Sequence, residues 1–499
     1  MFLGEAWAVA LERLGFGETL GLLWRGKRAY WALNLANFGD GVAYFGFLTL
    51  LVPFLNTRLL MTDPVAGLSV SLFTGLVALF MLNGGRIADR MGVRKALGWS
   101  LATSALGRGL LTASPGLGLG VLGNQCAAWL ALALMAYGAG VGQTALYVGV
   151  KEYTEARTES LGWDLLYSIM NLGIVGASLA SPLIRNPKLQ FGSLTIPALN
   201  WGIDGVFWTL TALTMALVVA NFFLFTPQME SSERNSPLPE GSGRIDQFLK
   251  GLALATVCGL IMGAIIHDTT VHPQLWAVLW IPLAIALAVL LLLYLRGLNI
   301  QFAFFIFILL PVRTLFAHQW LTMPSYIFRC FDQSIHQVME WIEMVNPLVV
   351  CIAVPLLALF TRRMRVINVM ILGTGISAAI TFVLVPAADP RLLLTYMVIF
   401  SIGEAIWASR FLEYVATLAP PGQTGAYMGV ANLPWFLAKF TTGMYSGLML
   451  ARFVPEQGVQ NPGSLWLVYA CFAMLSPLGL LLMRSWILQA EKHQPEVTA

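Results

Sequence analysis

The chain has 499 residues, of which 58% are hydrophobic and 11% are charged, and its formal net charge is +4. Ordinary soluble domains carry about 25% charged residues, so this composition argues strongly against a soluble globular protein. The basic residues follow a membrane pattern rather than a patch for nucleic acid. The five cysteines are far apart and include no CxxC pair, so neither a disulfide framework nor a zinc site is expected.

The first part of the chain predicts an interfacial segment followed by six membrane spans. Residues 1–28 are amphipathic and end in a basic cluster, which is typical of a cytoplasmic helix on the membrane surface. Apolar runs of about 18 residues or more are long enough to cross a bilayer. They predict a six-helix bundle over residues 29–226, with spans at 29–56, 65–84, 96–114, 121–149, 161–184 and 203–226.

A polar linker, Thr226–Arg244, is rich in Ser, Pro, Glu and Gly and marks the boundary between two halves. Two additional spans are expected at 246–266 and 274–296, within a linker region of residues 227–299. A second six-helix bundle is expected over 300–487, before a cytoplasmic tail at 488–499, with spans at 300–327, 341–361, 366–387, 391–418, 425–451 and 463–487. The predicted fold is an all-α polytopic membrane protein with 12 core helices in two bundles and two additional helices, about 14 in total.

The distribution of Lys and Arg predicts which loops are cytoplasmic, because cytoplasmic loops carry an excess of these residues. With the N-terminus inside, the inner loops hold most of the basic residues, and the outer loops hold only Arg58, Arg185, Lys188, Arg329, Arg391 and Arg452. An even number of spans then brings both termini into the cytoplasm. We expect a multi-pass protein of the cell's inner (plasma) membrane.

Short basic turns join adjacent spans at similar positions in the two halves, Ala88–Gly98 and Phe360–Gly373, and such internal repeats are common in secondary transporters. The first turn lies in the stretch GGRIADRMGVRKAL, which resembles the GxxxDRxGRR loop of the major facilitator superfamily. The matching residues, a candidate gating loop, are Gly85, Asp89, Arg90, Gly92 and Arg94.

The residue types of this loop suit a tight connection at helix ends. Glycines permit the turn. Asp89 is expected to face a helix N-terminus from the other half, and the arginines are expected to meet helix C-termini. The alternative is a plain basic loop on the inner side of the membrane.

Further stretches resemble the proton-dependent oligopeptide transporter family of that superfamily, as do the two additional helices. They are NFGDGVAYFG (Asn37–Gly46), YSIMNLGIVGASLASP (Tyr167–Pro182), FAHQWLTM (Phe316–Met323), NPLVVCIAVPLLALF (Asn346–Phe360) and SIGEAIWASRFLEYVATLAP (Ser401–Pro420). The resemblance implies the superfamily fold and a site in which Asn171, Asn346 and Glu404 hold the amino end of a peptide.

The sequence departs from the family pattern at the opposite end of that site. The family's ExxER motif becomes Asn37, Asp40 and Gly41, and Gln143 stands where the fourth span of the family carries lysine. His318 replaces an acidic residue on the seventh span, beside the matching Gln319. In the resembled family the missing cations engage the peptide carboxylate and the coupling carboxylates, so the chain resembles a divergent member.

Charged residues inside the spans are expected to have an interaction partner or a functional role. Inserting a charge near the bilayer centre costs at least about 2.5–3.5 kcal/mol of free energy. Glu404 lies at mid-membrane and has no partner on its own helix, so its partner must come from another span, from water or from a substrate. If it is buried and unpaired, it is expected to carry protons. The alternative is a fixed salt bridge to Lys439 or Arg313. Arg410 and Glu413 are three residues apart and are expected to pair with each other.

Two further spans carry candidate proton-coupling groups. Asp40 lies on a polar seam with Asn37 and Tyr44, which predicts a cavity or, alternatively, hydrogen bonds between helices. His318 can titrate near neutral pH, although a lone histidine is more often a satisfied hydrogen-bonding group. Pro311 on the same span predicts a kink. Asp40, His318 and Glu404 are therefore the candidates for proton coupling.

Arg313 and Lys439 are cations without an assigned partner on their own spans, and they hint at an anionic group on the substrate. The complete set of candidate substrate-binding residues is Asn37, Asp40, Tyr44, Gln143, Asn171, Arg313, Gln319, Asn346, Glu404 and Lys439.

The predicted function is secondary active transport, coupled to protons and working by alternating access, of a small peptide-like or amine-bearing solute. We expect a monomer surrounded by lipids, with no cofactor, no metal and no nucleic-acid partner. One alternative is an exporter or lipid-type carrier for an anionic or amphiphilic compound, and another is a transport-dead sensor or scaffold. An enzyme is not expected, because no nucleophile–base pair or set of metal ligands is evident.

Overall fold

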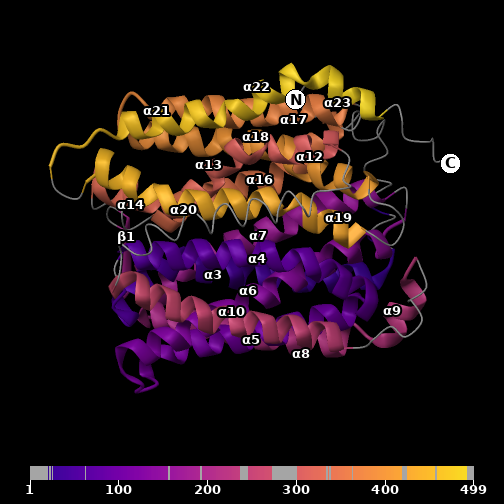
Figure 1. Ribbon diagram of the computed structural model, residues 1–499, viewed down its shortest axis with the longest axis horizontal. Helices are drawn as coiled ribbons and strands as arrows, with labels where there is room; N and C mark the ends of the chain where they lie inside the picture. The colour runs from indigo at the N-terminus through magenta and orange to yellow at the C-terminus, as the bar shows by residue number, and fades with distance from the viewer. Residues whose placement is uncertain are drawn as a thin grey trace.

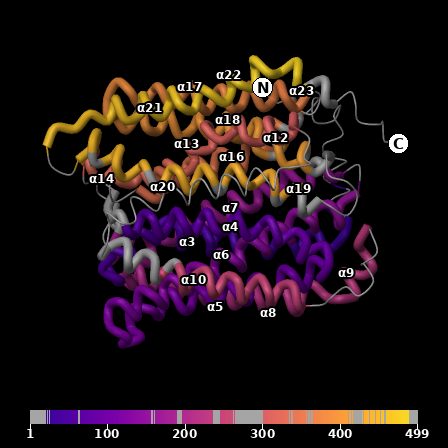
Figure 2. The backbone as a smooth tube through the Cα atoms, viewed as in Figure 1, coloured from indigo at the N-terminus to yellow at the C-terminus, as the bar shows by residue number. Residues whose placement is uncertain are grey.

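The structure is a computed structural model that describes residues 26–61, 63–155, 158–191, 194–235, 245–271, 300–332, 339–361, 364–418, 424–455 and 458–491, with positions 21, 24 and 335. Most of these residues are helical. The helices lie side by side in two layers, with the N-terminal helices below and the C-terminal ones above (Figure 1). The backbone tube shows the same two groups (Figure 2).

Six long helices form the N-terminal half: α3 (Arg28–Leu59), α4 (Asp63–Met91), α5 (Val93–Ala113), α6 (Gly120–Tyr153), α7 (Glu159–Arg185) and α8 (Gly202–Leu224). A short turn of 3-10 helix, η1 (Ser114–Gly116), follows α5. An antiparallel hairpin of β1 (Lys188–Phe191) and β2 (Leu194–Pro197) joins α7 to α8, with Lys188 opposite Pro197. The short helix α9 (Pro227–Glu233) and the long helix α10 (Asp246–Val271) come next.

The C-terminal half is also built of six helical spans, several of them broken into shorter helices. In chain order the helices are α12 (Ile300–Phe307), α13 (Leu310–Leu321), α14 (Met323–Cys330), α16 (Met339–Thr361), α17 (Val366–Ile380), η2 (Thr381–Leu384), α18 (Pro390–Leu418), α19 (Thr424–Ala431), α20 (Leu433–Phe453), α21 (Pro462–Ala473), α22 (Leu475–Leu482) and α23 (Arg484–Glu491).

The predicted helical membrane fold is confirmed, with one small difference. Within the described residues, nine helices are long and apolar enough to cross a membrane. The other predicted spans that the structure describes, at α5, α10, α16 and α20, are helical as well. The difference is the β1–β2 hairpin, which occupies a predicted outer loop. The predicted span at 274–296 and most of the N-terminal segment lie outside the described residues.

The outward surface of the helices is apolar, as contact with lipid requires. Side chains more than half exposed on α8 and α10 include Trp208, Met215, Val219, Phe222, Leu254, Val257 and Leu260. Exposed apolar surface of this extent is rare on soluble monomers. In a bilayer it contacts hydrocarbon, while the helical backbone satisfies its own hydrogen bonds.

Proline residues lie at the breaks in the C-terminal spans. Proline lacks a backbone N–H and its ring clashes with the carbonyl four residues earlier, so it interrupts a helix. The kink predicted from Pro311 is confirmed, because α12 ends at Phe307 and α13 begins at Leu310. Pro434 likewise lies in the first turn of α20, directly after the break at Asn432.

Helices α3 and α7 cross closely beside the centre of the molecule, because glycine faces backbone on both sides. A Cβ atom on Gly173 would lie 2.4 Å from the carbonyl oxygen of Phe38, and one on Gly41 would lie 2.9 Å from the carbonyl oxygen of Met170. Neither contact is possible for a larger residue without a shift of the backbone. This crossing sets the positions of the polar side chains that α3 and α7 turn toward the other half.

The additional helix α10 packs along α6, on the N-terminal half. Glycines allow a close approach, because a Cβ atom on Gly251 would lie 2.4 Å from the Tyr137 hydroxyl and one on Gly259 would lie 2.7 Å from Ala133 Cβ. The Tyr137 hydroxyl donates a hydrogen bond of 2.7 Å to the carbonyl of Phe248. The helix is therefore part of the N-terminal body.

The two halves meet where α7 packs against α16 and where α4 packs against α19 and α20. Arg185, the last residue of α7, forms an ion pair with Glu340 in the first turn of α16. The Glu340 side chain is 1% exposed and that of Arg185 is 27% exposed. A buried carboxylate of one half thus depends on a cation from the other half.

A methyl group added at Gly173 is expected to destabilise the protein by about 1–3 kcal/mol, the usual range for overpacking. Gly176→Ala is the matched control, because its new Cβ would meet Val42 Cγ2 at an ordinary 3.7 Å on the same helix. Thermal unfolding in detergent should show a lower midpoint for Gly173→Ala only. Equal effects of the two substitutions would contradict the close crossing.

Arg185→Gln is expected to lower the unfolding temperature, because loss of one partner from a buried ion pair typically costs about 3–5 kcal/mol. Adding Glu340→Gln should recover much of that loss, since no buried charge is then left unpaired. Arg58→Gln serves as the control: Arg58 and Asp204 pair at 2.6 Å with side chains 46% and 40% exposed. Exposed pairs contribute about 0–1 kcal/mol. Failure of the double variant to recover would contradict the dependence of Glu340 on Arg185.

Candidate functional site

A cavity of about 230 Å³ lies between the two halves and is lined by α3, α4, α6 and α7 on one side and by α13, α16, α18 and α20 on the other. Nine of the predicted substrate-binding residues line it: Asn37, Asp40, Tyr44, Gln143, Asn171, Gln319, Asn346, Glu404 and Lys439. Pockets for drug-sized ligands usually measure about 300–1,000 Å³, so this volume suits a small solute.

Glu404, on α18, is 5% exposed, and in the part of the chain that the structure describes it accepts hydrogen bonds only from neutral groups. The Tyr167 hydroxyl donates to Oε1, and Asn346 Nδ2 donates to Oε2 at 2.9 Å. The alternative of a salt bridge from Glu404 to Lys439 or Arg313 is not found, since the ion pairs formed among the described residues do not include it. Among the described residues, no fixed cation is therefore paired with the Glu404 carboxyl.

Tyr167 is a site residue that the sequence reasoning missed. It lies on α7 of the N-terminal half, lines the cavity and reaches Glu404 on α18 of the C-terminal half. Asn171 Nδ2 donates to the carbonyl of Tyr167 at 2.9 Å, one helical turn away. The spacing of four residues between Tyr167 and Asn171 could have indicated that Tyr167 faces the site, because side chains four apart share one face of a helix. The aromatic residues Tyr147, Trp320 and Trp435 also line the cavity and were not predicted.

Asp40, on α3, is paired with a cation from another helix. Arg108 Nη2, on α5, lies 2.8 Å from Asp40 Oδ1, and Arg108 Nη1 donates to Thr214 Oγ1 at 2.6 Å. The Arg108 side chain is 1% exposed, whereas that of Asp40 is 28% exposed and lines the cavity. Arg108, which does not line the cavity, therefore largely offsets the charge of Asp40.

The polar seam on α3 meets α7 as well as the cavity. Asn37 Nδ2 donates to the carbonyl of Leu166 at 2.7 Å, so one end of the amide is used between helices. Asn34 Nδ2 donates to the carbonyl of Tyr30 at 3.0 Å within its own helix. Both alternatives predicted for the seam, a cavity and hydrogen bonds between helices, are thus present.

Lys439, on α20, lines the cavity, and its Nζ lies 5.6 Å from the ring centre of Trp435. In the part of the chain that the structure describes, none of the ion pairs formed includes Lys439. Gln319, on the neighbouring helix α13, is 7% exposed, and its Nε2 has no hydrogen-bond acceptor among the described residues. These two side chains offer donors to the cavity.

Two predicted residues lie outside the cavity lining. Arg313 is fully buried, donates to the carbonyl of Ala431 at 3.2 Å and stacks on Phe411 and Trp435 at 4.5 and 5.1 Å. It therefore stabilises the end of α19 behind Trp435, and its prediction as a substrate ligand does not fit this position. The depth of a residue in a span is readable from the sequence, but the direction that it faces is not.

His318 is 1% exposed and is held by groups of its own half. Its Nδ1 lies 2.8 Å from Thr322 Oγ1, its Nε2 lies 3.0 Å from the Tyr445 hydroxyl, and its ring stacks on Tyr469 at 3.6 Å. The alternative of a satisfied hydrogen-bonding histidine describes this environment. Arg410 is buried on α18, and the side chain of Glu413, its predicted partner, lies outside the described residues.

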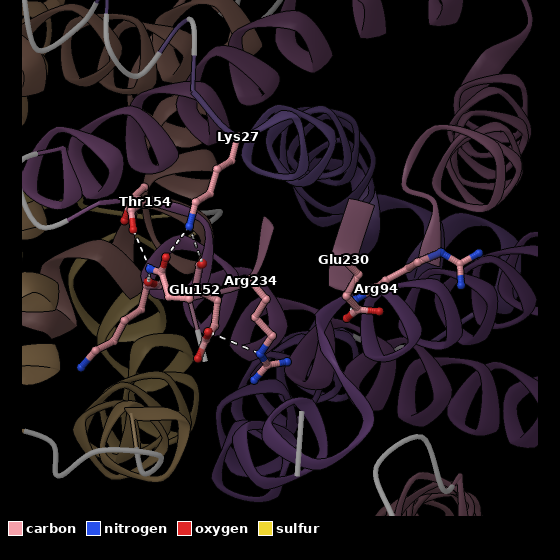
Figure 3. A network of polar contacts seen from close by, with 8 residues as sticks. Lys27, Arg94, Glu152, Thr154, Glu230 and Arg234 are labelled. Atoms are coloured by element: carbon pink, nitrogen blue, oxygen red, sulfur yellow. Dashed lines mark hydrogen bonds and ion pairs between the residues drawn. The ribbon is translucent and has the colours of Figure 1, made fainter. Parts of the chain in front are cut away.

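The predicted gating loop lies where α4 ends and α5 begins, and none of its matched residues lines the cavity. Figure 3 shows Arg94 of this loop beside Glu230. Gly92 adopts a φ of 84°, which few other residues tolerate. The Arg94 guanidinium donates to the carbonyls of Phe222 and Phe225 at the end of α8, as predicted for a helix C-terminus. Its backbone N–H donates to Glu230 Oε1 at 3.0 Å.

Other parts of this loop differ from expectation. Asp89 is partly buried near Arg234 and Glu152, both from the first 235 residues. That Asp89 faces a helix N-terminus of the other half stays a prediction. Arg90 is exposed. Gly84, beside the matched Gly85, makes the close contact with α6, since its Cβ would lie 2.5 Å from Thr144 Oγ1.

The segment from α9 to Asn235 contacts the start of α3, the start of α5 and the end of α6, and so holds these helix ends together (Figure 3). Glu233 accepts from the backbone N–H of Ala29 at 2.7 Å, at the start of α3, and Arg234 pairs with Glu152 at 3.4 Å. Asn235 Nδ2 donates to the carbonyls of Lys151 and Thr154 at the end of α6. Acidic groups thus meet helix N-termini, where the helix dipole favours them.

Burial raises the pKa of the Glu230 carboxyl in this segment, and this effect outweighs the lowering by the backbone N–H of Arg94 and by nearby cations. The carboxyl is buried at 6% exposure against the start of α5. No group of three or more His, Cys, Asp or Glu side chains suited to a metal ion occurs among the described residues.

Solved structures share the fold of this chain across nearly its whole length. A POT family transporter in complex with 5-aminolevulinic acid is 15% identical with a TM-score of 0.69, and 92% of this chain and 97% of that one are covered. A peptide transporter POT in complex with sulfate is 17% identical with a TM-score of 0.68, covering 92% and 95%. A bacterial homologue of the human drug peptide transporters PepT1 and PepT2 is 17% identical with a TM-score of 0.63, covering 93% and 99%.

At these identities the likeness is one of fold, and the expected resemblance to the oligopeptide transporters is confirmed at that level. A search of curated protein sequences finds no match to the chain. The family model described as Major Facilitator Superfamily matches residues 33–438, which include every cavity-lining residue among the described residues except Lys439. With this match over most of its length, the chain belongs to the major facilitator superfamily of membrane transporters.

Proposed function

We propose that this protein is a proton-coupled secondary transporter that moves a small amine-bearing or peptide-like solute by alternating access. It acts as a monomer in the cell's inner membrane with both termini in the cytoplasm. The observation that carries the proposal is the Glu404 carboxyl, which lies in the cavity wall with two neutral hydrogen-bond donors and no cation among the described residues.

A carboxylate at this depth is costly unless its charge is offset. A proton and a substrate ammonium group can each offset it, and they compete for the same oxygen atoms. Exchange of one for the other is the elementary step that coupling requires. Of the three candidate coupling groups, Glu404 is favoured, because Asp40 is paired with Arg108 and His318 does not line the cavity.

The groups around Glu404 match the donors of an ammonium ion. Asn346 and Asn171 each use Nδ2 to donate within the protein, and this assignment leaves Oδ1 of each amide as an acceptor. With the Glu404 carboxylate, the two amide oxygens form a set of three acceptors. An ammonium group has three N–H donors, whereas a carboxylate or phosphate has none.

The hydrogen bond from Tyr167 links this site to the arrangement of the halves, because it joins α7 to α18. When the halves separate at this level the bond must break, and Glu404 then needs another donor. A proton or an ammonium group supplies it. Occupation of the site therefore biases the equilibrium between inward-facing and outward-facing states, as alternating access requires.

A carrier for an anionic or amphiphilic compound is the second candidate, and Lys439 in the cavity wall is the observation that favours it. Arg313, the other buried cation of this half considered for an anionic group, lies behind Trp435 and does not line the cavity.

Glu404→Gln is expected to abolish uptake driven by a pH gradient in liposomes, because the amide carries no exchangeable charge. A charge-assisted hydrogen bond contributes about 1.5–3 kcal/mol, so amine binding should weaken about tenfold to a hundredfold. Asp389→Asn is the control: Asp389 caps the start of the same helix at 2.7 Å from the Arg391 N–H, outside the cavity. Uptake that ignores both the gradient and Glu404→Gln would overturn the coupling role.

Tyr167→Phe is expected to reduce driven uptake about tenfold while the protein still folds, since only a hydroxyl that donates to a charged group is removed. Tyr147→Phe is the matched control, because Tyr147 lines the same cavity from α6 but its hydroxyl bonds to Gln143. Uptake rates and unfolding temperatures of the two variants should be compared. Similar uptake by both would show that the bond between the halves is dispensable.

A further inference from the structure

The cavity contains charges of both signs that the protein itself leaves separate. Asp40, Glu404 and Lys439 are its charged lining residues in the described part of the chain. Asp40 is paired with Arg108 at 2.8 Å, so it adds little net charge. Glu404 and Lys439 remain, one acidic and one basic, and neither belongs to an ion pair among the described residues.

Lys439 is poorly compensated where it lies. A cation within a membrane span is costly unless its charge is offset. The Trp435 ring, whose centre lies 5.6 Å from Lys439 Nζ, offsets that cost only in part. An anion in the cavity, which Lys439 lines, would offset the rest.

Gln319 gives a second and independent sign of an anionic ligand. It lines the cavity at 7% exposure, and its buried Nε2 has no acceptor among the described residues. Its helix, α13, packs against α20, which carries Lys439. A buried donor without an acceptor is destabilising, and a ligand oxygen bound to Gln319 Nε2 would remove that cost.

The hydrogen-bond donors and acceptors that line the cavity therefore lie on different pairs of helices. The acceptors Glu404 and Asn346 come from α18 and α16, which pack together, and the donors Lys439 and Gln319 come from α20 and α13. We propose that the cavity takes a small zwitterion, whose carboxylate binds Lys439 and Gln319 while its amine binds Glu404. The proposal rests on the proposed function for the amine end and adds a carboxylate site in the same half of the protein.

The test uses purified full-length protein and measures binding of L-alanyl-L-alanine, its C-terminal amide and its N-acetyl derivative. The free dipeptide should bind at least about tenfold more tightly than the amide, as expected for loss of a charge-assisted hydrogen bond. Lys439→Gln should remove this preference, and Lys439→Arg should retain part of it. A preference for the free carboxylate that survives Lys439→Gln would overturn the proposal.

The two ends of the ligand can be judged separately. If the N-acetyl derivative binds as tightly as the free dipeptide and Glu404→Gln changes nothing, the amine site fails while the Lys439 result still stands. If the amide binds as well as the free dipeptide but the amine is still required, the carboxylate site fails alone. Absence of binding by L-alanine, dialanine and trialanine would overturn the zwitterion.

Stability of the ligand-free protein gives an independent readout. Lys439→Gln removes a charge that the protein does not offset, so its unfolding temperature should equal or exceed that of the unmodified protein. Arg108→Gln is the contrasting variant, since it leaves Asp40 without its partner and should unfold at a lower temperature. A large loss of stability in Lys439→Gln would instead indicate a structural role and would overturn the proposal.

Discussion

The cost of placing charge in a membrane organises the centre of this protein. Asp40 offsets that cost by forming an ion pair with Arg108, and Glu340 offsets it by pairing with Arg185 of the other half. Glu404 does not, because only neutral donors reach it among the described residues. A transporter needs this contrast: fixed pairs hold helices in register, whereas an unpaired charge can be satisfied in turn by a proton and by a substrate.

Much of the architecture could be predicted from the sequence because its causes are local. Apolar length defines the spans, and Pro311 marks the break between α12 and α13. Motif order also led to Asn171, Asn346 and Glu404, which the structure brings to one cavity. These features depend on composition along the chain and on residue types that few other positions share.

The other features of the site depend on how the helices are rotated against each other, and the spacing of residues along the chain does not determine that rotation. The partner of Asp40 is on α5, 68 positions away, and no periodicity links it to α3. Arg313 and His318 lie at the depth expected but face the packing between helices of their own half. Tyr167 was overlooked although it lies one turn from Asn171, because an aromatic residue in a span is usually read as core.

The contacts of α9 and α10 indicate which helices form one mechanical unit with the N-terminal half. Glu233 and Asn235 hold the ends of α3 and α6, and α10 lies along α6 as far as its glycines allow. As a mechanical unit the N-terminal half therefore extends through α10, well past the change in composition at Thr226 that separates the halves in the sequence. The first additional helix is therefore expected to move as one unit with the bundle that precedes it.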